Sequence, residues 1–281
     1  MGMRRYFNTE GLCEADIHYM VNIDERLKQI KELLVDRGKY FVINRGRQYG
    51  KTTTLRALAN YLKEDYVVVS LDFQGMSTAN FETERKFVFS FATIFVDAIK
   101  MQLDKDKHQK LQKISELASD EQFDMKELFV QLSKVCAMSK NPIVMMIDEV
   151  DSASNNQVFI DFLAQLRQYY LARRDKPTFY SVILAGVYNI KNLKLKIRPD
   201  ENHQYNSPWN IAAKFNIDMS FSAEQIAEML KEYETDYQTG MDIADVLDEI
   251  YQYTSGYPYL VSAICKYLDE ELTDAWTKKA L

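Results

Sequence analysis

Apolar runs and helical periodicities alternate along the chain as far as residue 186. Continuous runs rich in β-branched and aromatic residues predict strands of the kind that are buried on both faces of a parallel sheet. The predicted strands cover residues 40–43, 66–73, 143–147 and 179–186. Between them, apolar residues recur at the spacing of a buried helix face. The predicted helices cover residues 22–37, 52–62, 81–103, 123–138 and 155–173.

Three other segments complete the pattern. The charged residues 104–113 predict a solvated turn or a helix end, and residues 217–221 predict a short last strand. Ser222 and Gln225 then form a capping-box signature, after which only helical patterns follow. Alternating strands and helices predict an α/β fold with a parallel sheet, and the helical tail predicts an appended bundle.

The composition is that of a folded globular protein, with 47% hydrophobic and 27% charged residues. Three widely separated cysteines, Cys13, Cys136 and Cys265, indicate neither a disulfide framework nor a zinc site. The sequence shows no apolar signal core and no run of about 18 apolar residues that would span a bilayer. We therefore expect a cytoplasmic protein without membrane contact.

Charge is distributed unevenly around a net value of −6. Residues 41–63 contain five basic residues and no acid, and residues 163–198 contain eight basic residues and one acid. Residues 222–275, in contrast, contain thirteen acids and two lysines. Two interpretations stay open: the opposite charges neutralise each other across a domain contact, or residues 163–198 bind a polyanion such as nucleic acid.

A phosphate-binding pattern follows the first predicted strand. Residues 45–52 (RGRQYGKT) lie between a strand and a helix, where backbone N–H groups and a helix N-terminus can point at a phosphate. Gly50 allows close approach, Lys51 can reach the β and γ phosphates, and the Thr52 hydroxyl can ligate magnesium. The alternative is a plain turn. The residues expected to contact the nucleotide here are Gly46, Arg47, Gln48, Tyr49, Gly50, Lys51, Thr52 and Thr53.

Arg45 departs from this pattern, because it stands where G-x-x-x-x-G-K-[ST] begins with glycine. A side chain restricts the turn at that point, and we expect Gly46, one position later, to supply the flexibility. Thr53 and Thr54 have an alternative role as caps of the following helix.

Two acids, Asp148 and Glu149, end the apolar strand 143–147. A buried parallel strand delivers its C-terminal residues to the ligand crevice of an open sheet. Asp148 is expected to hold magnesium, and Glu149 to polarise a water in line with the γ-phosphate. The alternative is a strand end that meets solvent, but the two motifs occur in the order that phosphate chemistry requires. Asp151 is interpreted as a helix-capping or orienting residue.

These motifs, within residues 8–21, 40–55, 147–152, 181–187, 205–222 and 254–261, resemble a bacterial family of AAA-ATPase-like proteins related to the archaeal-type ATPases and the STAND branch of P-loop NTPases. The resemblance implies ATP binding and a P-loop NTPase three-layer αβα fold with a mainly parallel sheet, in which the acid-bearing strand is separated from the loop strand. It also implies a C-terminal helical lid and Glu149 as the water-activating residue. The expected domains are an N-terminal segment (1–21) packing on the nucleotide site, an ATPase core (22–221) and the lid (222–281), for which C-terminal truncation stays open.

The resemblance adds residues that the patterns alone do not supply. It makes His18 and Tyr19 candidates for contact with adenine, and Pro258 part of a lid motif, Gly256-Tyr257-Pro258, near the nucleotide. A satisfied surface histidine and a helix breaker are the alternatives. For the charge donor to the transition state we favour Arg198 over the other candidates, and Asn189 is a candidate sensor or a loop amide. The other arginine candidates are Arg167, Arg173 and Arg174.

The function expected from this sequence is magnesium-dependent ATP hydrolysis coupled to movement of the lid or of a partner. The alternative is a nucleotide-gated interaction module with negligible turnover, and action on DNA through residues 163–198 is a third possibility. A protein partner or self-association is expected beside ATP and ADP. A small-molecule kinase is disfavoured, because no separate element for an acceptor substrate is visible.

Overall fold

The computed structural model describes residues 4–104, 108–120, 122–187, 209–271 and 276. They fall into two compact units. The sheet unit consists of residues 29–45 and 57–216, and the helical unit of residues 1–28, 46–56 and 217–281. The phosphate-loop segment, residues 46–56, therefore groups with the N-terminal segment and the C-terminal helices.

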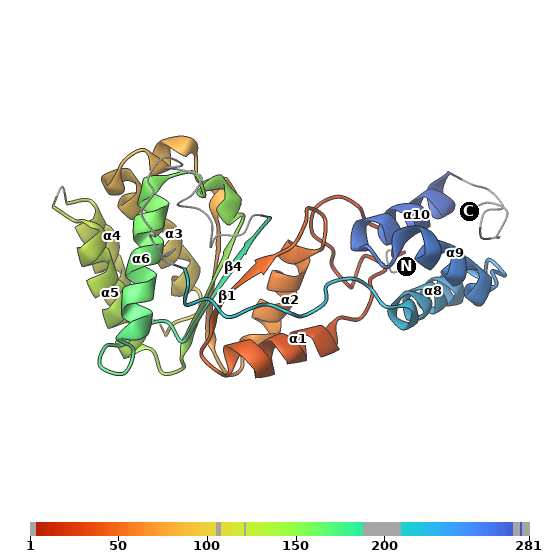
Figure 1. Cartoon of the computed structure of the whole chain (residues 1–281), viewed down its shortest axis with the longest axis horizontal. Coiled ribbons are helices and arrows are strands. Elements are labelled where there is room, and N and C mark those ends of the chain that lie inside the picture. Colours follow the sequence, from red (N-terminus) through yellow and green to blue (C-terminus); the bar gives the residue numbers. More distant parts are fainter. Residues whose placement is uncertain (1–3, 105–107, 121, 188–208, 272–275, 277–281) are drawn as a thin grey trace. The chain divides into compact units, whose positions relative to one another are not determined.

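Among the described residues, the sheet unit contains four strands, all paired in parallel. Their order is β1-β4-β3-β2, so β4 separates the loop strand β1 from the acid-bearing strand β3 (Figure 1). Register pairs such as Val42 with Leu184 and Val69 with Met145 join buried residues across the sheet. The predicted parallel sheet is confirmed. Its strands are β1 (Tyr40–Asn44), β2 (Val67–Asp72), β3 (Ile143–Asp148) and β4 (Ser181–Gly186).

Helices cover both faces of this sheet, which gives the three layers. On one face, alternate strand residues pack into a core rich in phenylalanine, of which Phe87, Phe91 and Phe162 are fully buried. On the opposite face lies α2 (Lys51–Leu62), whose Leu58 and Leu62 are fully buried (Figure 1). The helices that contribute to the first face are α3 (Glu84–Lys100), α4 (His108–Ala118), α5 (Met125–Met138) and α6 (Gln157–Leu171).

Two predicted segments differ from the observed structure. Where a solvated turn or a helix end was expected in 104–113, residues from 108 onward form α4, because Leu111 and Ile114 turn one buried face toward the core. Residues 217–221 form no strand. Instead Ala213 makes an isolated parallel bridge to Phe41, with its N–H donating to the Tyr40 carbonyl at 2.8 Å.

Helix ends also shift for local reasons. The predicted helix 22–37 is α1 (Asp24–Ile30) continued by a π-helical stretch, Lys31–Val35. The predicted helix 81–103 starts later, at Glu84, because the Thr83 side chain caps the Lys86 N–H.

Three C-terminal helices build the helical unit: α8 (Ala223–Tyr237), α9 (Ile243–Thr254) and α10 (Pro258–Glu270). The capping box is confirmed, since the Gln225 N–H donates to Ser222 Oγ at 3.2 Å and the Ser222 N–H donates to Gln225 Oε1 at 3.0 Å. The N-terminal segment joins the same core through Phe7, which lies 5.1 Å from the Tyr233 ring. Among the described helices, none combines the length and apolar composition needed to cross a membrane.

Candidate functional site

The phosphate loop turns sharply between β1 and α2. Gln48 and Gly50 have φ angles of 61° and 68°, in the left-handed region, and α2 begins at the next residue, Lys51. No atom lies within 4 Å of a Cβ built on Gly50, so the backbone conformation rather than space favours glycine there. Turns of this kind direct successive N–H groups into a concavity that suits an anion.

Arg45 and Gly46 have no positive φ, which removes the strain expected for a side chain at position 45. The flexibility expected of Gly46 is therefore not used. A Cβ on Gly46 would lie 3.4 Å from the Tyr49 ring, so its glycine leaves room for that side chain. The Arg45 guanidinium lies 5.2 Å from the centroid of the Phe215 ring within the sheet unit.

The side chains of the loop differ in exposure. Arg47 and Gln48 are exposed, whereas Lys51 is only 7% exposed and donates from Nζ to the Gly46 carbonyl at 3.0 Å. The lysine ammonium thus lies over the loop backbone. Thr52 is exposed and Thr53 is half-buried in the first turn of α2. These positions suit contact with a phosphate, and their roles stay predictions.

A tyrosine from the start of α10 contacts this loop. The Tyr257 hydroxyl donates to the Arg47 carbonyl at 2.6 Å, and the Tyr257 ring lies 4.6 Å from the ring of Tyr49. Burial raises the pKa of Tyr257. Pro258, which was the residue predicted from this motif, is buried as the first residue of α10. Sequence reasoning included Tyr257 in the Gly256-Tyr257-Pro258 motif but chose Pro258 as the site residue.

Gly256, the residue before Tyr257, packs closely against the backbone of Phe221. Its φ is 74°, and a Cβ at this position would lie 2.0 Å from the Phe221 carbonyl oxygen. The Phe221 N–H also donates to the Gly256 carbonyl at 2.8 Å. Only glycine permits this close contact, so the motif does more than interrupt a helix.

His18 and Tyr19 are both buried in the helical unit. His18 Nδ1 accepts the Glu14 N–H at 2.9 Å, so this histidine is satisfied, but in the interior and not at the surface. The Tyr19 hydroxyl donates to Asp236 at 2.7 Å, and burial, followed by this carboxylate, raises its pKa. Contact of either residue with adenine stays a prediction. Glu14 also pairs with Arg56 of α2 at 3.5 Å.

The acidic turn follows β3 in the sheet unit. Asp148, 8% exposed, is in register with Asp72 of β2, and its Oδ1 accepts the Glu149 N–H at 2.9 Å. Glu149 is half-buried and has a φ of 52°. A short 3₁₀ turn, Val150–Ser152, comes next.

Asp151 bonds to the end of the neighbouring strand. Its Oδ2 accepts the N–H of Val187, the residue after β4. This bond is of the kind expected for the orienting role, one of the two roles predicted for Asp151.

The predicted charge donor, Arg198, and the candidate sensor, Asn189, lie outside the described residues. Of the other candidates, Arg173 donates to the Gly38 carbonyl at 2.8 Å and lies 4.2 Å from the Tyr170 ring. Gly38 precedes β1, so Arg173 lies at the amino end of the sheet, opposite the acidic turn. Nucleic-acid binding through residues 163–198 stays a prediction, because residues 188–198 are not described.

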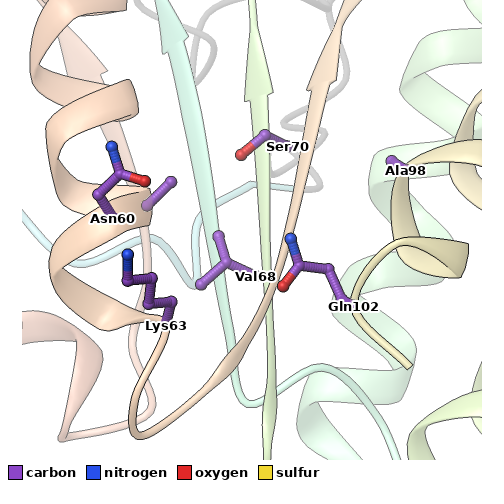
Figure 2. Close-up of a pocket in the computed structure, with 7 residues that line it drawn as sticks. Asn60, Lys63, Val68, Ser70, Ala98 and Gln102 are labelled. Carbon is purple, nitrogen blue, oxygen red and sulfur yellow. The ribbon is translucent and has the colours of Figure 1, made fainter. Parts of the chain in front are cut away.

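A pocket of about 220 Å³ lies beside β2, between the end of α2 and α3 (Figure 2). The polar ends of Asn60, Lys63 and Gln102 surround the strand there. None of the predicted site residues lines it. Among the described residues, no group of three or more His, Cys, Asp or Glu side chains gathers as a metal site.

Comparison with known proteins gives a family and a fold. The sequence model of a family described as AAA-like domain matches residues 9–277. No curated protein matches the chain in sequence. A Walker-type ATPase of Pyrococcus abyssi is similar in structure, with a TM-score of 0.57 and 16% identity over 89% of this chain and 68% of that one. The ORC2 protein of Aeropyrum pernix, solved as ADPNP–ADP complexes, gives a TM-score of 0.51 and 11% identity over 92% and 67%. At these identities the likeness concerns the fold alone, and it agrees with the predicted P-loop NTPase architecture with a C-terminal helical region.

Proposed function

The chain belongs to the AAA-like domain family, and from this premise we propose that it binds ATP and hydrolyses it with magnesium. The observation that carries the proposal is the phosphate loop. Its left-handed Gln48 and Gly50 lie directly before α2, and Lys51 lies over the loop backbone. Backbone donors, a helix N-terminus and a lysine together form the recognition chemistry of a polyphosphate.

Each proposed residue has one task. Lys51 exchanges its bond to the Gly46 carbonyl for the β and γ phosphates. Gly50 lets the backbone approach them. Glu149 accepts a hydrogen bond from the attacking water, which orients the water toward the γ-phosphate, and takes up its proton as the water attacks. Arg198 is the proposed donor of charge to the transition state.

The donor chemistry fits magnesium, which prefers oxygen ligands and uses few of them from the protein. Thr52 is an exposed residue in the first turn of α2, and Asp148 ends β3. When bound, the metal would neutralise phosphate charge. We propose Thr52 and Asp148 as its protein ligands.

Coupling to the C-terminal helices is the second part of the proposal. Tyr257 is the N-cap residue of α10, and its hydroxyl donates to the Arg47 carbonyl at 2.6 Å while its ring contacts Tyr49. A nucleotide that reshapes the loop must therefore either keep or break this contact. Because a ligand shifts a conformational equilibrium by its differential affinity, breaking the contact would link nucleotide state to the helices.

The test compares ATP affinity and phosphate release for the full chain and three variants. Lys51→Ala is expected to weaken ATP binding. Glu149→Gln is expected to keep binding and lose turnover, since the amide preserves shape but cannot take up a proton. Lys63→Ala, an exposed position at the end of α2, is the matched control and should behave as wild type. A wild type that neither binds nor hydrolyses ATP would refute the proposal.

A nucleotide-gated interaction module is the second candidate, and the Tyr257 contact favours it too, because a switch needs only binding. ADP retained through purification, without turnover, would support it over hydrolysis. Loss of binding to a partner protein in the Lys51→Ala variant would be the further evidence for this candidate.

A further inference from the structure

Glu149 has an unusual backbone for its residue type. Its φ and ψ are 52° and 39°, in the left-handed region that residues with a Cβ rarely adopt. Such a conformation persists where the surrounding structure holds it, and it is concentrated at functional sites. The direction of the Glu149 side chain therefore depends on what fixes this turn.

A hydrogen bond on one side and a polar contact on the other connect the turn to the ends of both strands that flank β3. On one side, Asp151 Oδ2 accepts the Val187 N–H just after β4. On the other side, Ser152 Oγ lies 3.3 Å from the carbonyl oxygen of Phe73, just after β2, and donates to the Glu149 carbonyl at 2.9 Å. Since the strand order is β4-β3-β2, the turn is held from both neighbours.

Gly186 reserves the space for the Asp151 carboxylate. A Cβ on Gly186 would lie 3.0 Å from each carboxylate oxygen and 3.0 Å from Val150 Cγ2. Gly186 does not have a positive φ, so the backbone alone would accept other residues. The missing side chain, rather than backbone freedom, explains glycine at this strand end.

We propose that Asp151 is a positioning residue for ATP hydrolysis: through its bond to Val187 it fixes the turn that orients Glu149. This inference rests on the proposed function, in which Glu149 activates the water. Asp151 is assigned no contact with nucleotide, so its removal should change turnover and not binding.

The test measures kcat and ATP Kd for the full chain, with kcat referred to the number of nucleotide-binding sites. Asp151→Ala is expected to lower kcat about 10- to 100-fold, as small misplacements of catalytic groups do, with Kd changed less than about twofold. Asp151→Asn keeps an oxygen that can accept the Val187 N–H, and should recover most of kcat. Asp161→Ala is the control, because Asp161 is exposed on α6, where its Oδ1 accepts a hydrogen bond from the Gln157 side-chain amide.

Two further variants separate positioning from general damage. In a Glu149→Gln background, Asp151→Ala should lower kcat little further, because a residue that acts only by orienting Glu149 has no effect once the Glu149 carboxylate is absent. Gly186→Ala should lower kcat with Asp151 intact, which keeps the test available if Asp151→Ala does not fold. An active wild type beside an equally active Asp151→Ala overturns this inference alone. A wild type that binds ATP without turnover overturns the proposed function and this inference with it.

Discussion

Replacing Gly256 with alanine should destabilise the protein more than the same change at Gly240. Both glycines have left-handed φ angles, 74° and 76°, so both variants carry the backbone cost of about 1–2 kcal/mol. They differ in space: a Cβ at 240 meets no atom within 4 Å, whereas a Cβ at 256 would lie 2.0 Å from the Phe221 carbonyl oxygen. Because that oxygen belongs to the backbone, the chain must move, at about 1–3 kcal/mol for overpacking.

The expected loss in free energy of unfolding is therefore about 2–5 kcal/mol for Gly256→Ala and about 1–2 kcal/mol for Gly240→Ala. Urea titration followed by far-ultraviolet circular dichroism measures both. The two midpoints should separate while the slopes stay equal. Equal destabilisation of the two variants would refute the argument, since it would mean that the contact with Phe221 imposes no constraint.

Two other predictions concern single contacts of the helical unit. Tyr257→Phe removes the hydrogen bond to the Arg47 carbonyl. The loss of one hydrogen bond, a net contribution of about 1 kcal/mol, would change ATP affinity about fivefold. Isothermal titration calorimetry measures this change, with Tyr253→Phe at an exposed position as the control. The Tyr19 hydroxyl and the Arg5 guanidinium hold the pKa of Asp236 below its ordinary value. A carboxylate with a lowered folded-state pKa stabilises the fold above its unfolded pKa, about 3.9, and this contribution disappears as the pH falls through the folded value. As the pH drops below about 4, the urea midpoint of the wild type should therefore decrease more steeply than that of Asp236→Asn. Parallel plots of midpoint against pH for the two proteins would contradict the assignment.

Local periodicity predicted most of the sheet unit, because its elements satisfy their own patterns. The strand 143–147 is apolar at every position, as a strand covered on both faces must be, and it is observed as β3. The capping residues Ser222 and Gln225 lie three positions apart and bond to each other, so the signal and the structure occupy the same short segment. Patterns complete within one segment need no knowledge of the rest of the fold.

The element α4 escaped prediction because its apolar face is narrow. Leu111 and Ile114 are separated by Gln112 and Lys113, and most of residues 104–113 are charged. The prediction of a strand at 217–221 was wrong, because a short alternating run forms a strand only where another strand pairs with it. In the sheet unit, β1 makes an isolated bridge with Ala213.

An orienting role was predicted for Asp151, but the partners that make such a role possible could not be predicted, because they belong to distant segments. Gly186 and Gly256 look alike in the sequence, but each leaves room for an atom from elsewhere in the chain: an Asp151 oxygen in one case and the Phe221 carbonyl in the other. Gly186 even lacks the positive φ that would mark it as a turn residue. The motif Ile-Asp-Glu-Val-Asp-Ser contains the groups that carry the proposed chemistry, whereas the contacts of its turn are with Val187 and Phe73, at the ends of two other strands. We therefore expect substitutions at positions outside the motifs, such as Gly186, to alter turnover, although the motifs alone do not predict this effect.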